Sequence, residues 1–586
     1  MSGGSRAGRL AGLAGLVGGL YLLLTAGALA DALALVAVAS LALHGAERAL
    51  RRSLLQVVPR RLGVVPAEVH SRLLLQQALV LVYLLRSGDL TGAAEVTVVV
   101  AVVLHTGLRA VFAAGQVLDD ETRRGNAQVR GLDVEGGPVP PRPALLREAG
   151  HDLVVHAAAL PALALLWALV TGSHALVAPA AVLMVAVALG VLLAVTPHLV
   201  AVARLPRGTR RWRLVNAAVQ RHAPLVVLYS SGGVNSVHQI VMWLDTLDEM
   251  RRPGLVMLRD PDVFAGMRPT TTPVVLLPHP HQVTAFEMPS ARVALYVANG
   301  AENLRLLRNT ALRSAFIGHG DSDKASSANP FTRVHDEVWV AGEAGRQRYL
   351  DADVGVRPEA IRIVGRPQTS RIRRAAPRPP GEPWTVVYAP TWEGLYGDPY
   401  ESSLAHSGRE IVRTLLAMDG VRLVYRPHPG TGRNDPGVAR LSEELARTVR
   451  DAGPEHRVLV GTGVDLAALF NEADALVADV SGVVSDFIAS GKPYFVVNGR
   501  GVPDEEFRAR VSAARGAYLV GPGGAGLAEA LADARSVDSM REQREATRVH
   551  LLGPPTDDPV ETFAQAVDAL AAVPGSSAPV PVADRA

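Results

Sequence analysis

The amino-terminal third of the chain is a nearly continuous series of apolar segments, which limits the possible folds more than any other feature. Up to about residue 200 Ala, Leu and Val dominate, and the 586-residue chain has a mean hydropathy of +0.19. The run Leu10–Leu43 is too long for one membrane-spanning helix and contains Asp31, so we predict two helices with a turn near Gly27–Asp31. Further candidate spans are Leu73–Leu85, Val96–Ala114, Leu153–Val170 and Leu176–Val195. Residues 1–200 are expected to form a transmembrane helical region of about six spans, and the first run is too long for a cleaved secretory signal.

The arginines between these segments predict an orientation. The loops near Gly27–Asp31, Ser87–Gly92 and Thr171–His174 contain none. Arg6 and Arg9 precede the first segment, and the segments that follow the second, fourth and sixth spans contain Arg48, Arg51, Arg52, Arg60, Arg61, Arg123, Arg124, Arg130, Arg204, Arg207, Arg210, Arg211 and Arg213. Because basic loops stay inside, we expect a multi-pass cell-membrane protein with both termini and the later domain in the cytoplasm. Glu95, His105 and His156 lie near predicted span ends and form no evident relay, which favours anchoring over transport.

From Pro224 onward the pattern changes to short apolar runs separated by helical segments. Seven runs precede a Pro-rich hinge at 373–383, at residues 224–233, 254–260, 272–280, 291–299, 314–320, 336–342 and 361–365. Five follow it, at 384–392, 421–429, 456–461, 474–482 and 492–499. Buried strands alternating with helices indicate parallel sheets covered on both faces. We therefore predict two doubly wound Rossmann-like halves, at 214–372 and 384–570, with a cleft between them and a disordered tail at 571–586.

Composition excludes some chemistry. The formal net charge of +3 gives no reason to expect a nucleic-acid partner, and the absence of cysteine excludes disulfides and thiolate sites. Among 59 basic residues only Lys324 and Lys492 are lysines, which draws attention to their positions. The pairs Asp321/Asp323 and Asp351/Asp353 have a metal-binding spacing that is common by chance. No metal site is predicted from them or from the His279/His281 pair.

Three strand ends carry residues suited to phosphate chemistry. In GHGDSDK (318–324) His319 stands between two glycines, with Lys324 in the same loop; the alternative is a surface turn. In YRPHPG (425–430) Arg426 and His428 form a basic pair suited to a phosphate or a developing oxyanion.

The segment 472–493, EADALVADVSGVVSDFIASGKP, contains the third strand end. Its strand ends at Asp479, and Ser481 and Gly482 could open a helix whose free N–H groups bind an anion. Lys492 precedes the next strand. An N-cap serine without a ligand is the alternative.

The order of these motifs resembles the CDP-glycerol glycerophosphotransferase family, enzymes that prime and polymerise teichoic acid and related polymers. The resemblance rests on HG followed by Lys, APTW, RPHP and DALVADVSGVVSDF…GKPYFVVN, within about residues 310–500. It implies a GT-B architecture, His319 as general base, and a donor diphosphate contacted by Arg426 and His428. It also implies donor phosphate on Ser481 and a cleft shaped by Pro390, Thr391 and Trp392. The family's D-Y-S-S appears here as 479–482, DVSG, and its W-H-G as 318–320, GHG.

The resulting expectation is a membrane-bound, metal-independent transferase without a cofactor. It would move a polyol phosphate, most simply glycerol phosphate, from a CDP-activated donor to a lipid-linked or polymeric acceptor. Asp479, Gly482, Lys324 and Lys492 are expected beside the donor phosphates, and His428 is expected to act in catalysis with His319. The alternatives are a GT-B glycosyltransferase that uses a nucleotide sugar, or an inactive membrane scaffold of the same fold. Polyol, acceptor and oligomeric state are left open.

Overall fold

The chain folds into two compact units. The computed structural model describes residues 3–57, 64–88, 90, 92–233, 236–319, 329–376, 381–393, 402–461 and 464–573. One unit comprises Met1–Asn126 and Glu135–Arg211, and the other comprises Ala127–Val134 and Trp212–Ala586. The chain therefore passes from one unit to the other three times.

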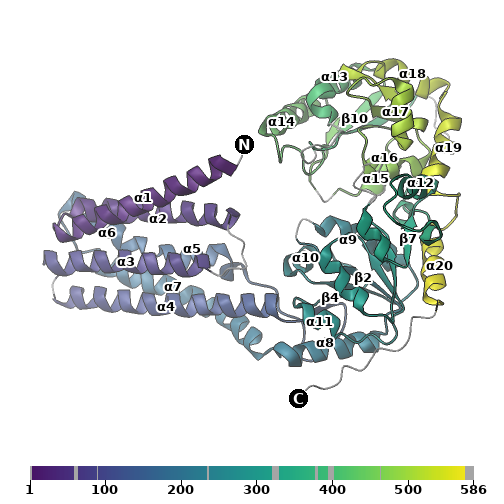
Figure 1. Cartoon of the computed structure of the whole chain (residues 1–586). Coiled ribbons are helices and arrows are strands. Elements are labelled where there is room, and N and C mark those ends of the chain that lie inside the picture. Colours follow the sequence, from purple (N-terminus) through teal and green to yellow (C-terminus); the bar gives the residue numbers. More distant parts are fainter. Residues whose placement is uncertain are drawn as a thin grey trace. The chain divides into compact units, whose positions relative to one another are not determined.

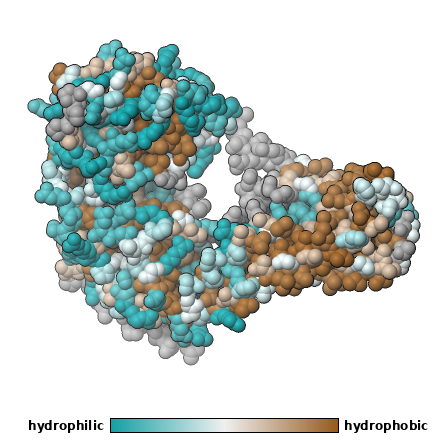
Figure 2. Space-filling model, turned by 180° about the vertical axis from the view of Figure 1, so that it is seen from behind, coloured by the Kyte–Doolittle hydropathy of each residue, from teal (hydrophilic) through white to brown (hydrophobic). Residues whose placement is uncertain are grey.

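The first unit is a helical bundle with an apolar surface (Figures 1 and 2). Its helices are α1 (Gly3–Leu29), α2 (Leu33–Val57), α3 (Val64–Ser87), α4 (Gly92–Gly125), α5 (Glu148–His156), α6 (Ala159–Thr171) and α7 (Val177–Arg204). Within the described part of the chain three helices, α1, α4 and α7, are long and apolar enough to cross a membrane. The pair α5 and α6, bent by 46°, would make a fourth, whereas the apolar parts of α2 and α3 are shorter. The six-span count stays a prediction.

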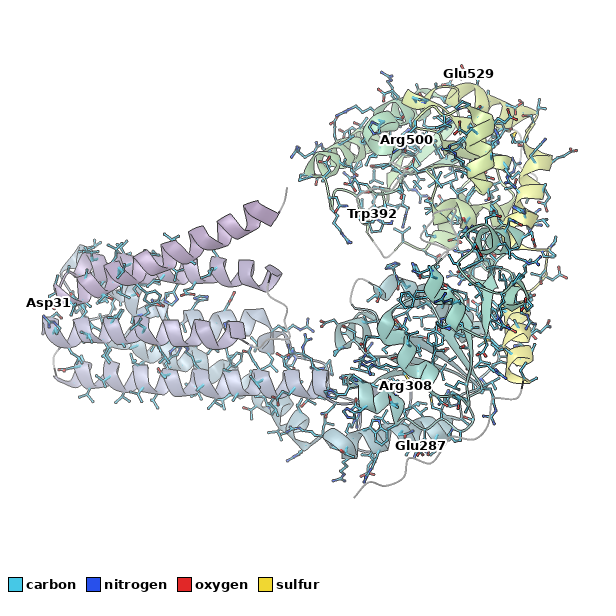
Figure 3. All side chains as sticks on the ribbon, viewed as in Figure 1. Asp31, Glu287, Arg308, Trp392, Arg500 and Glu529 are labelled. Atoms are coloured by element: carbon cyan, nitrogen blue, oxygen red, sulfur yellow. The ribbon has the colours of Figure 1, made fainter. Side chains whose placement is uncertain are left out.

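The turn predicted near Asp31 lies between α1 and α2 (Figure 3). Asp31 adopts a positive φ of 53° and its carboxylate lies 3.4 Å from the Arg86 guanidinium. Arg86 belongs to the last turn of α3, next to a loop expected to lack arginine. An exposed pair of this kind contributes little stability.

A buried polar network crosses the interior of the bundle, contrary to the scattered arrangement expected from sequence. His105 on α4 accepts from Gln77 on α3 through Nδ1 (2.9 Å) and donates from Nε2 to the Val154 carbonyl of α5 (2.9 Å). The Nδ1 atoms of His44 on α2 and His156 lie 3.0 Å apart. The network lies beside the interruption between α5 and α6, where His105 binds the Val154 carbonyl and His44 approaches His156. Polar groups beside such a break need partners inside the bundle, because an apolar environment offers none.

The second unit begins with an eight-stranded sheet of order β1-β4-β3-β2-β5-β6-β7-β8. Its strands are β1 (Gln128–Arg130), β2 (Val226–Ser230), β3 (Gly254–Leu258), β4 (Val274–Leu276), β5 (Val293–Tyr296), β6 (Arg313–Phe316), β7 (Glu337–Val340) and β8 (Ile361–Ile363). The main helices of this half are α8 (Gly208–His222), α9 (Val237–Glu249), α10 (Pro261–Gly266), α11 (Pro280–Thr284) and α12 (Glu343–Asp351). All pairings are parallel except that of β1 with β4.

A second, wholly parallel sheet follows the hinge, with the order β11-β10-β9-β12-β13-β14. Its strands are β9 (Trp384–Ala389), β10 (Val421–Tyr425), β11 (Arg457–Val458), β12 (Ala475–Ala478), β13 (Tyr494–Val497) and β14 (Tyr518–Val520). The helices here are α13 (Ser403–Ala417), α14 (Pro436–Asp451), α15 (Leu466–Glu472), α16 (Gly482–Phe487), α17 (Asp504–Arg510), α18 (Leu527–Ser536) and α19 (Arg541–Leu552). Every predicted strand is present, and the predicted class, a helical bundle plus two Rossmann-like halves of the GT-B type, is confirmed.

Two segments do not follow the predicted domain boundaries. The strand β1 lies between α4 and α5 in sequence, yet it pairs with β4 of the first sheet. The last helix, α20 (Pro559–Ala571), packs against the first half rather than the second. The ring of Phe563 on α20 lies 5.3 Å from Trp243 and 5.2 Å from Trp339. The sequence pattern of β1 or of α20 does not indicate which sheet that segment packs against.

His335 is a buried titratable group in the core of the first half. It directly precedes Asp336 and β7, and its ring packs 4.6 Å from Tyr296 and 5.7 Å from Phe316. Burial lowers the pKa of His335 to about 4, although the neighbouring Asp336 opposes the shift. Since the unfolded chain has the ordinary value near 6.5, this contribution to stability is complete above pH 6.5 and is lost as the pH falls towards 4.

Replacing His335 by Phe should therefore weaken the acid sensitivity of the fold. At pH 5.5 the wild-type protein should lose about 1 kcal/mol of stability through this group, and the variant should not. Thermal unfolding of the detergent-solubilised protein at pH 7.5 and 5.5 measures the difference. The exposed His281→Phe serves as the control, and an equal pH response in all three proteins would contradict this assignment.

Candidate functional site

The carboxyl end of the second sheet collects most of the residues singled out from sequence. Strands β10, β9 and β12 are neighbours, so the segments that follow them emerge side by side. These segments contain Pro390, Thr391, Trp392, Arg426, His428, Asp479, Ser481 and Gly482. Open parallel sheets bind ligands at this carboxyl end of their strands.

Asp479 organises this edge from a buried position. It is 2% exposed; one carboxylate oxygen accepts from the Thr391 amide at 2.7 Å and the other accepts from the Ser403 amide at 3.1 Å. Ser402 also donates from its hydroxyl to the Thr391 carbonyl at 2.6 Å. Asp479 thus binds backbone amides of the β9–α13 connection. Both carboxylate oxygens therefore accept from the backbone, which fixes the start of this connection beside the end of β12.

Arg426 and His428 follow β10 on the other side of β9. Arg426 is 8% exposed, and its guanidinium makes no hydrogen bond or ion pair within the described residues; its Nε is buried without a partner. Burial lowers the pKa of Arg426 below its usual range. His428 accepts from the Gly430 amide through Nδ1 at 2.9 Å, so a neutral ring carries its proton on Nε2. The Trp392 ring stacks on it at 6.0 Å.

Ser481 is the N-cap residue of α16 but does not cap it. Its side chain makes no cap hydrogen bond, and its Oγ is a second buried polar atom without a partner among the described residues. At Gly482 an added Cβ would meet nothing within 4 Å. Two unsatisfied donors, on Ser481 and Arg426, therefore follow strands that are separated only by β9. Buried polar groups normally have partners, so this edge is suited to an anionic ligand.

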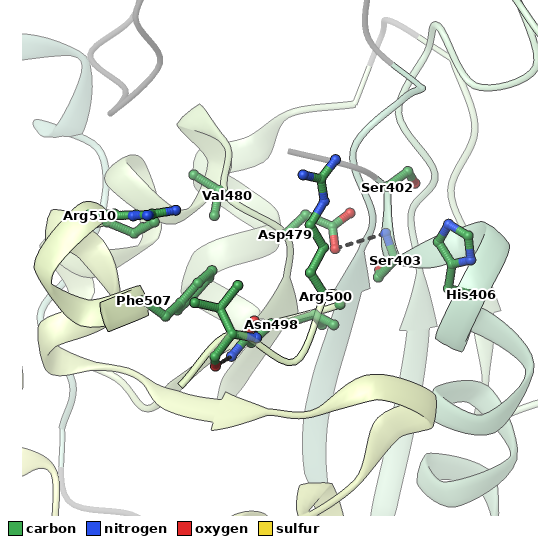
Figure 4. Close-up of a pocket in the computed structure, with 13 residues that line it drawn as sticks. Ser402, Ser403, His406, Asp479, Val480, Asn498, Arg500, Phe507 and Arg510 are labelled. Carbon is green, nitrogen blue, oxygen red and sulfur yellow. Dashed lines mark hydrogen bonds between the residues drawn. The ribbon is translucent and has the colours of Figure 1, made fainter. Parts of the chain in front are cut away.

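A cavity of about 230 Å³ extends from Asp479 towards β13 (Figure 4). Its floor is apolar, and polar side chains surround it, with Arg500 after β13 and Arg510 at the end of α17. The lining residues are Ser402, Ser403, His406, Asp479, Val480, Val497, Asn498, Gly499, Arg500, Val502, Phe507, Arg510 and Val511. Of these residues only Asp479 was a predicted site residue. The basic segment NGRG at the end of β13 was a usable signal, because it follows the same strand-end rule.

In the first half His319 follows β6. Its Nδ1 donates to the Val297 carbonyl at 2.8 Å, which leaves the Nε2 lone pair of a neutral ring available as a base. The indole of Trp243 fixes the preceding residue by donating to the Gly318 carbonyl at 2.8 Å. A second imidazole, that of His238 at the start of α9, lies 6.0 Å away and was not anticipated. Lys324, Asp321 and Asp323 lie outside the described residues.

Lys492 corrects one expectation. Its ammonium group donates to the carbonyls of Phe470, Asn471 and Ala473, at 2.9, 3.0 and 2.6 Å. These carbonyls belong to the end of α15. Lys492 precedes β13, so it lies at the amino end of the sheet, whereas the phosphate candidates lie at its carboxyl end. The reason is the attraction of a compact cation for the orphan carbonyls of a helix end, which makes this lysine a structural cap.

Across the described ranges no group of three or more histidine or acidic side chains is arranged to hold a metal ion. Asp353, one of the spaced acidic residues, lies instead in a turn with a φ of 43°. The rings of His279 and His281 stack on each other at 5.5 Å on the surface of the first half. These positions remain outside the candidate site.

Replacing Lys492 by Met should test its reassignment. Loss of the three charged hydrogen bonds should lower stability by about 2–3 kcal/mol, because the α15 carbonyls lose a partly buried donor. Donor affinity in the folded protein should be unchanged. Thermal unfolding and a donor titration measure the two effects, with the exposed Arg413→Met as the matched control. A weaker donor affinity at unchanged stability would restore the phosphate-binding role.

Comparisons with known proteins give a likeness of fold. No protein-family model matches the chain, and no curated protein sequence matches it. Among solved structures, the wall teichoic acid polymerase TagF is similar over 62% of this chain and 93% of its own, at 13% identity and a TM-score of 0.39. HepE from Anabaena, solved in complex with UDP, is similar over 60% of this chain and 100% of its own, at 12% identity and a TM-score of 0.38. A putative UDP-N-acetylglucosamine 2-epimerase from Listeria monocytogenes is similar over 58% and 94%, at 12% identity and a TM-score of 0.39.

Proposed function

We propose that this protein is a membrane-bound transferase that moves a polyol phosphate from a CDP-activated donor to a lipid-linked or polymeric acceptor. The observation that carries the proposal is the Arg426 guanidinium, which is buried at a strand end without an anion to neutralise it among the described residues. Burial of an unpaired charge is costly, so it is retained where a ligand supplies the opposite charge. A diphosphate is an anion of the right kind, because arginine binds phosphate oxygens in a bidentate manner.

The donor phosphates would lie across β9, between Arg426 and Ser481. His428 would donate from Nε2 to a phosphate oxygen, since its Nδ1 is already occupied by the Gly430 amide. Asp479 would act indirectly, by holding the Thr391 and Ser403 amides that shape the edge. The aromatic face of Trp392 and the cavity beside Asp479 are the two neighbouring surfaces for the organic groups of the donor.

His319 would act as the general base. Its Nε2 would take the proton of an acceptor hydroxyl while that oxygen attacks the β-phosphorus of the donor in line. The new bond joins acceptor oxygen to phosphorus, and the bond that breaks joins phosphorus to the oxygen that leaves with CMP. The leaving charge would be met by Arg426, His428 and the Ser481 hydroxyl. Positioning and electrostatic stabilisation would supply most of the rate enhancement, without a metal or a cofactor.

The membrane helices and the proposed reaction fit each other. A nucleotide-activated donor is a cytoplasmic metabolite, whereas a lipid-linked acceptor is confined to the membrane surface. An enzyme with a cytoplasmic transferase unit attached to a membrane bundle would meet both substrates. The positive-inside distribution of arginine supports this orientation. The identity of the polyol rests on the sequence resemblance. The nucleotide released from the donor distinguishes a CDP-polyol from the alternative nucleotide sugars.

Purified protein is incubated with a lipid acceptor and each member of a panel of CDP-polyols and nucleotide sugars. It should release CMP from a CDP-polyol. His319→Asn should lower kcat by about 10²–10⁴-fold, since a general base is lost. Arg426→Gln should weaken donor binding and kcat together. His281→Asn, an exposed histidine of the same half, is the control. Release of UDP or GDP would establish the glycosyltransferase alternative, and undiminished turnover by both variants would reject the mechanism.

The proposed orientation is testable because the natural chain has no cysteine. Ser173→Cys, in the loop between α6 and α7, should react with a membrane-impermeant maleimide on intact cells. Ser536→Cys, on α18 of the transferase unit, should react only after the membrane is opened. Labelling of Ser536→Cys on intact cells would place the transferase unit outside and contradict a cytoplasmic donor.

A further inference from the structure

Four exposed arginines continue from the end of α7, the most apolar of the three long candidate membrane spans. Arg204 occupies the last turn of α7, Arg207 lies in the connection, and Arg210 and Arg213 lie on α8. Each is three residues from the next, and all four side chains are exposed. We refer to these four residues as the arginine series. On α8 a spacing of three residues places Arg210 and Arg213 on one face.

The arginine series has little negative charge to balance it. Residues 153–244 contain no Asp or Glu. Arg210 lies 3.5 Å from Glu135, but both side chains are largely exposed, at 73% and 69%, so that pair is weak. Arg207 donates to the Val202 carbonyl, and Arg204 and Arg213 make no hydrogen bond or ion pair within the described residues.

Arg211 shows by contrast what a structural arginine looks like in the same segment. It is 2% exposed and donates to the carbonyls of Glu135 and Gly137, at 3.3 and 2.9 Å. Its burial face on α8 is shared with Val215 and Val219. The arginine series therefore differs from Arg211: its four side chains are exposed and have weak partners or none within the described residues, whereas Arg211 is enclosed.

An apolar face of α7 leads directly to Arg204. Leu189, Leu193 and Val200 are 42%, 62% and 41% exposed. With Arg204 they stand at positions i, i+4, i+11 and i+15, which share one face of an α-helix. Because α7 has the length and hydropathy of a membrane span, this face would meet lipid chains. A lipid whose chains lie along it would place its headgroup at Arg204.

We propose that the end of α7 and the start of α8 form a binding site for an anionic phospholipid. The acyl chains would pack along Leu189, Leu193 and Val200, and the phosphate would be held by the arginine series. Guanidinium groups suit this role because they pair with phosphate oxygens and lose less hydration than an ammonium does. A juxtamembrane arginine contributes about 1 kcal/mol, or roughly fivefold in affinity, towards an anionic surface. The site does not depend on the transferase reaction.

Native mass spectrometry of the full chain, titrated with phosphatidylglycerol or phosphatidylcholine in detergent, tests the proposal. Wild-type protein should retain phosphatidylglycerol preferentially. Replacing Arg207 and Arg213 by Gln should raise its dissociation constant about 25-fold and leave phosphatidylcholine unaffected. This double variant keeps Arg204, Arg210 and Arg211, so the orientation signal persists, and an unchanged melting temperature checks its fold.

The matched control is the double variant Arg440→Gln and Arg447→Gln, two exposed arginines of α14 in the transferase unit. It should bind phosphatidylglycerol as the wild type does. Equal retention of the two lipids by the wild type, or equal losses in both double variants, would overturn the proposal. Displacement of phosphatidylglycerol by millimolar inorganic phosphate would also overturn it, because the site would then recognise free phosphate rather than a lipid.

Discussion

The buried carboxylate of Asp479 holds the proposed donor site together. By accepting from the amides of Thr391 and Ser403 it ties the end of β12 to the segment that leaves the central strand β9. Trp392 follows Thr391 and stacks on His428, so the same tie also sets the position of the basic residues after β10. An acidic residue beside a phosphate site would ordinarily repel the ligand. Here both of its oxygens accept from backbone amides, so the cationic and hydroxyl groups are the candidates for contact with the proposed ligand.

Strand ends were the part of the site that sequence could predict. In a parallel sheet the carboxyl ends of neighbouring strands meet, so Arg426, His428, Thr391 and Ser481 could be grouped without knowing the strand order. The order β10-β9-β12 then explains why they form one edge. Lys492 does not satisfy this rule, because it precedes a strand instead of following one. Its position relative to the strand was a better guide to its role than the scarcity of lysine in the chain. The cavity residues around Phe507 and Arg510 come from α17 and its connection, where no strand pattern directs attention.

The interior of the helical bundle was less predictable for a different reason. Hydropathy identifies apolar helices but cannot show which side faces a neighbour, so His44 and Gln76 were passed over. In the structure Gln76 donates to the Ser40 carbonyl and approaches the His44 ring at 3.1 Å, and the interrupted α5–α6 helix lies beside them. Such a network specifies which helices pack together, because each polar side chain is satisfied only by its own partner. The strands of the two sheets, by contrast, are continuous apolar runs, and such runs are expected to be buried on both faces of a sheet.

The strand β1 changes how the chain can be divided. It lies between α4 and α5, but its three residues pair with β4 at the edge of the first sheet. A fragment that begins after α7 would contain every other strand of the second unit, but the edge of β4 that faces away from β3 would be left unpaired. An exposed strand edge invites pairing with another chain, and the fragment would also lack Ala127 and Val129, which are buried in the core of the first half, so it would tend to aggregate. The amino-terminal part of the chain thus supplies one edge strand of the first sheet, and the border between the two units does not coincide with any single position in the sequence.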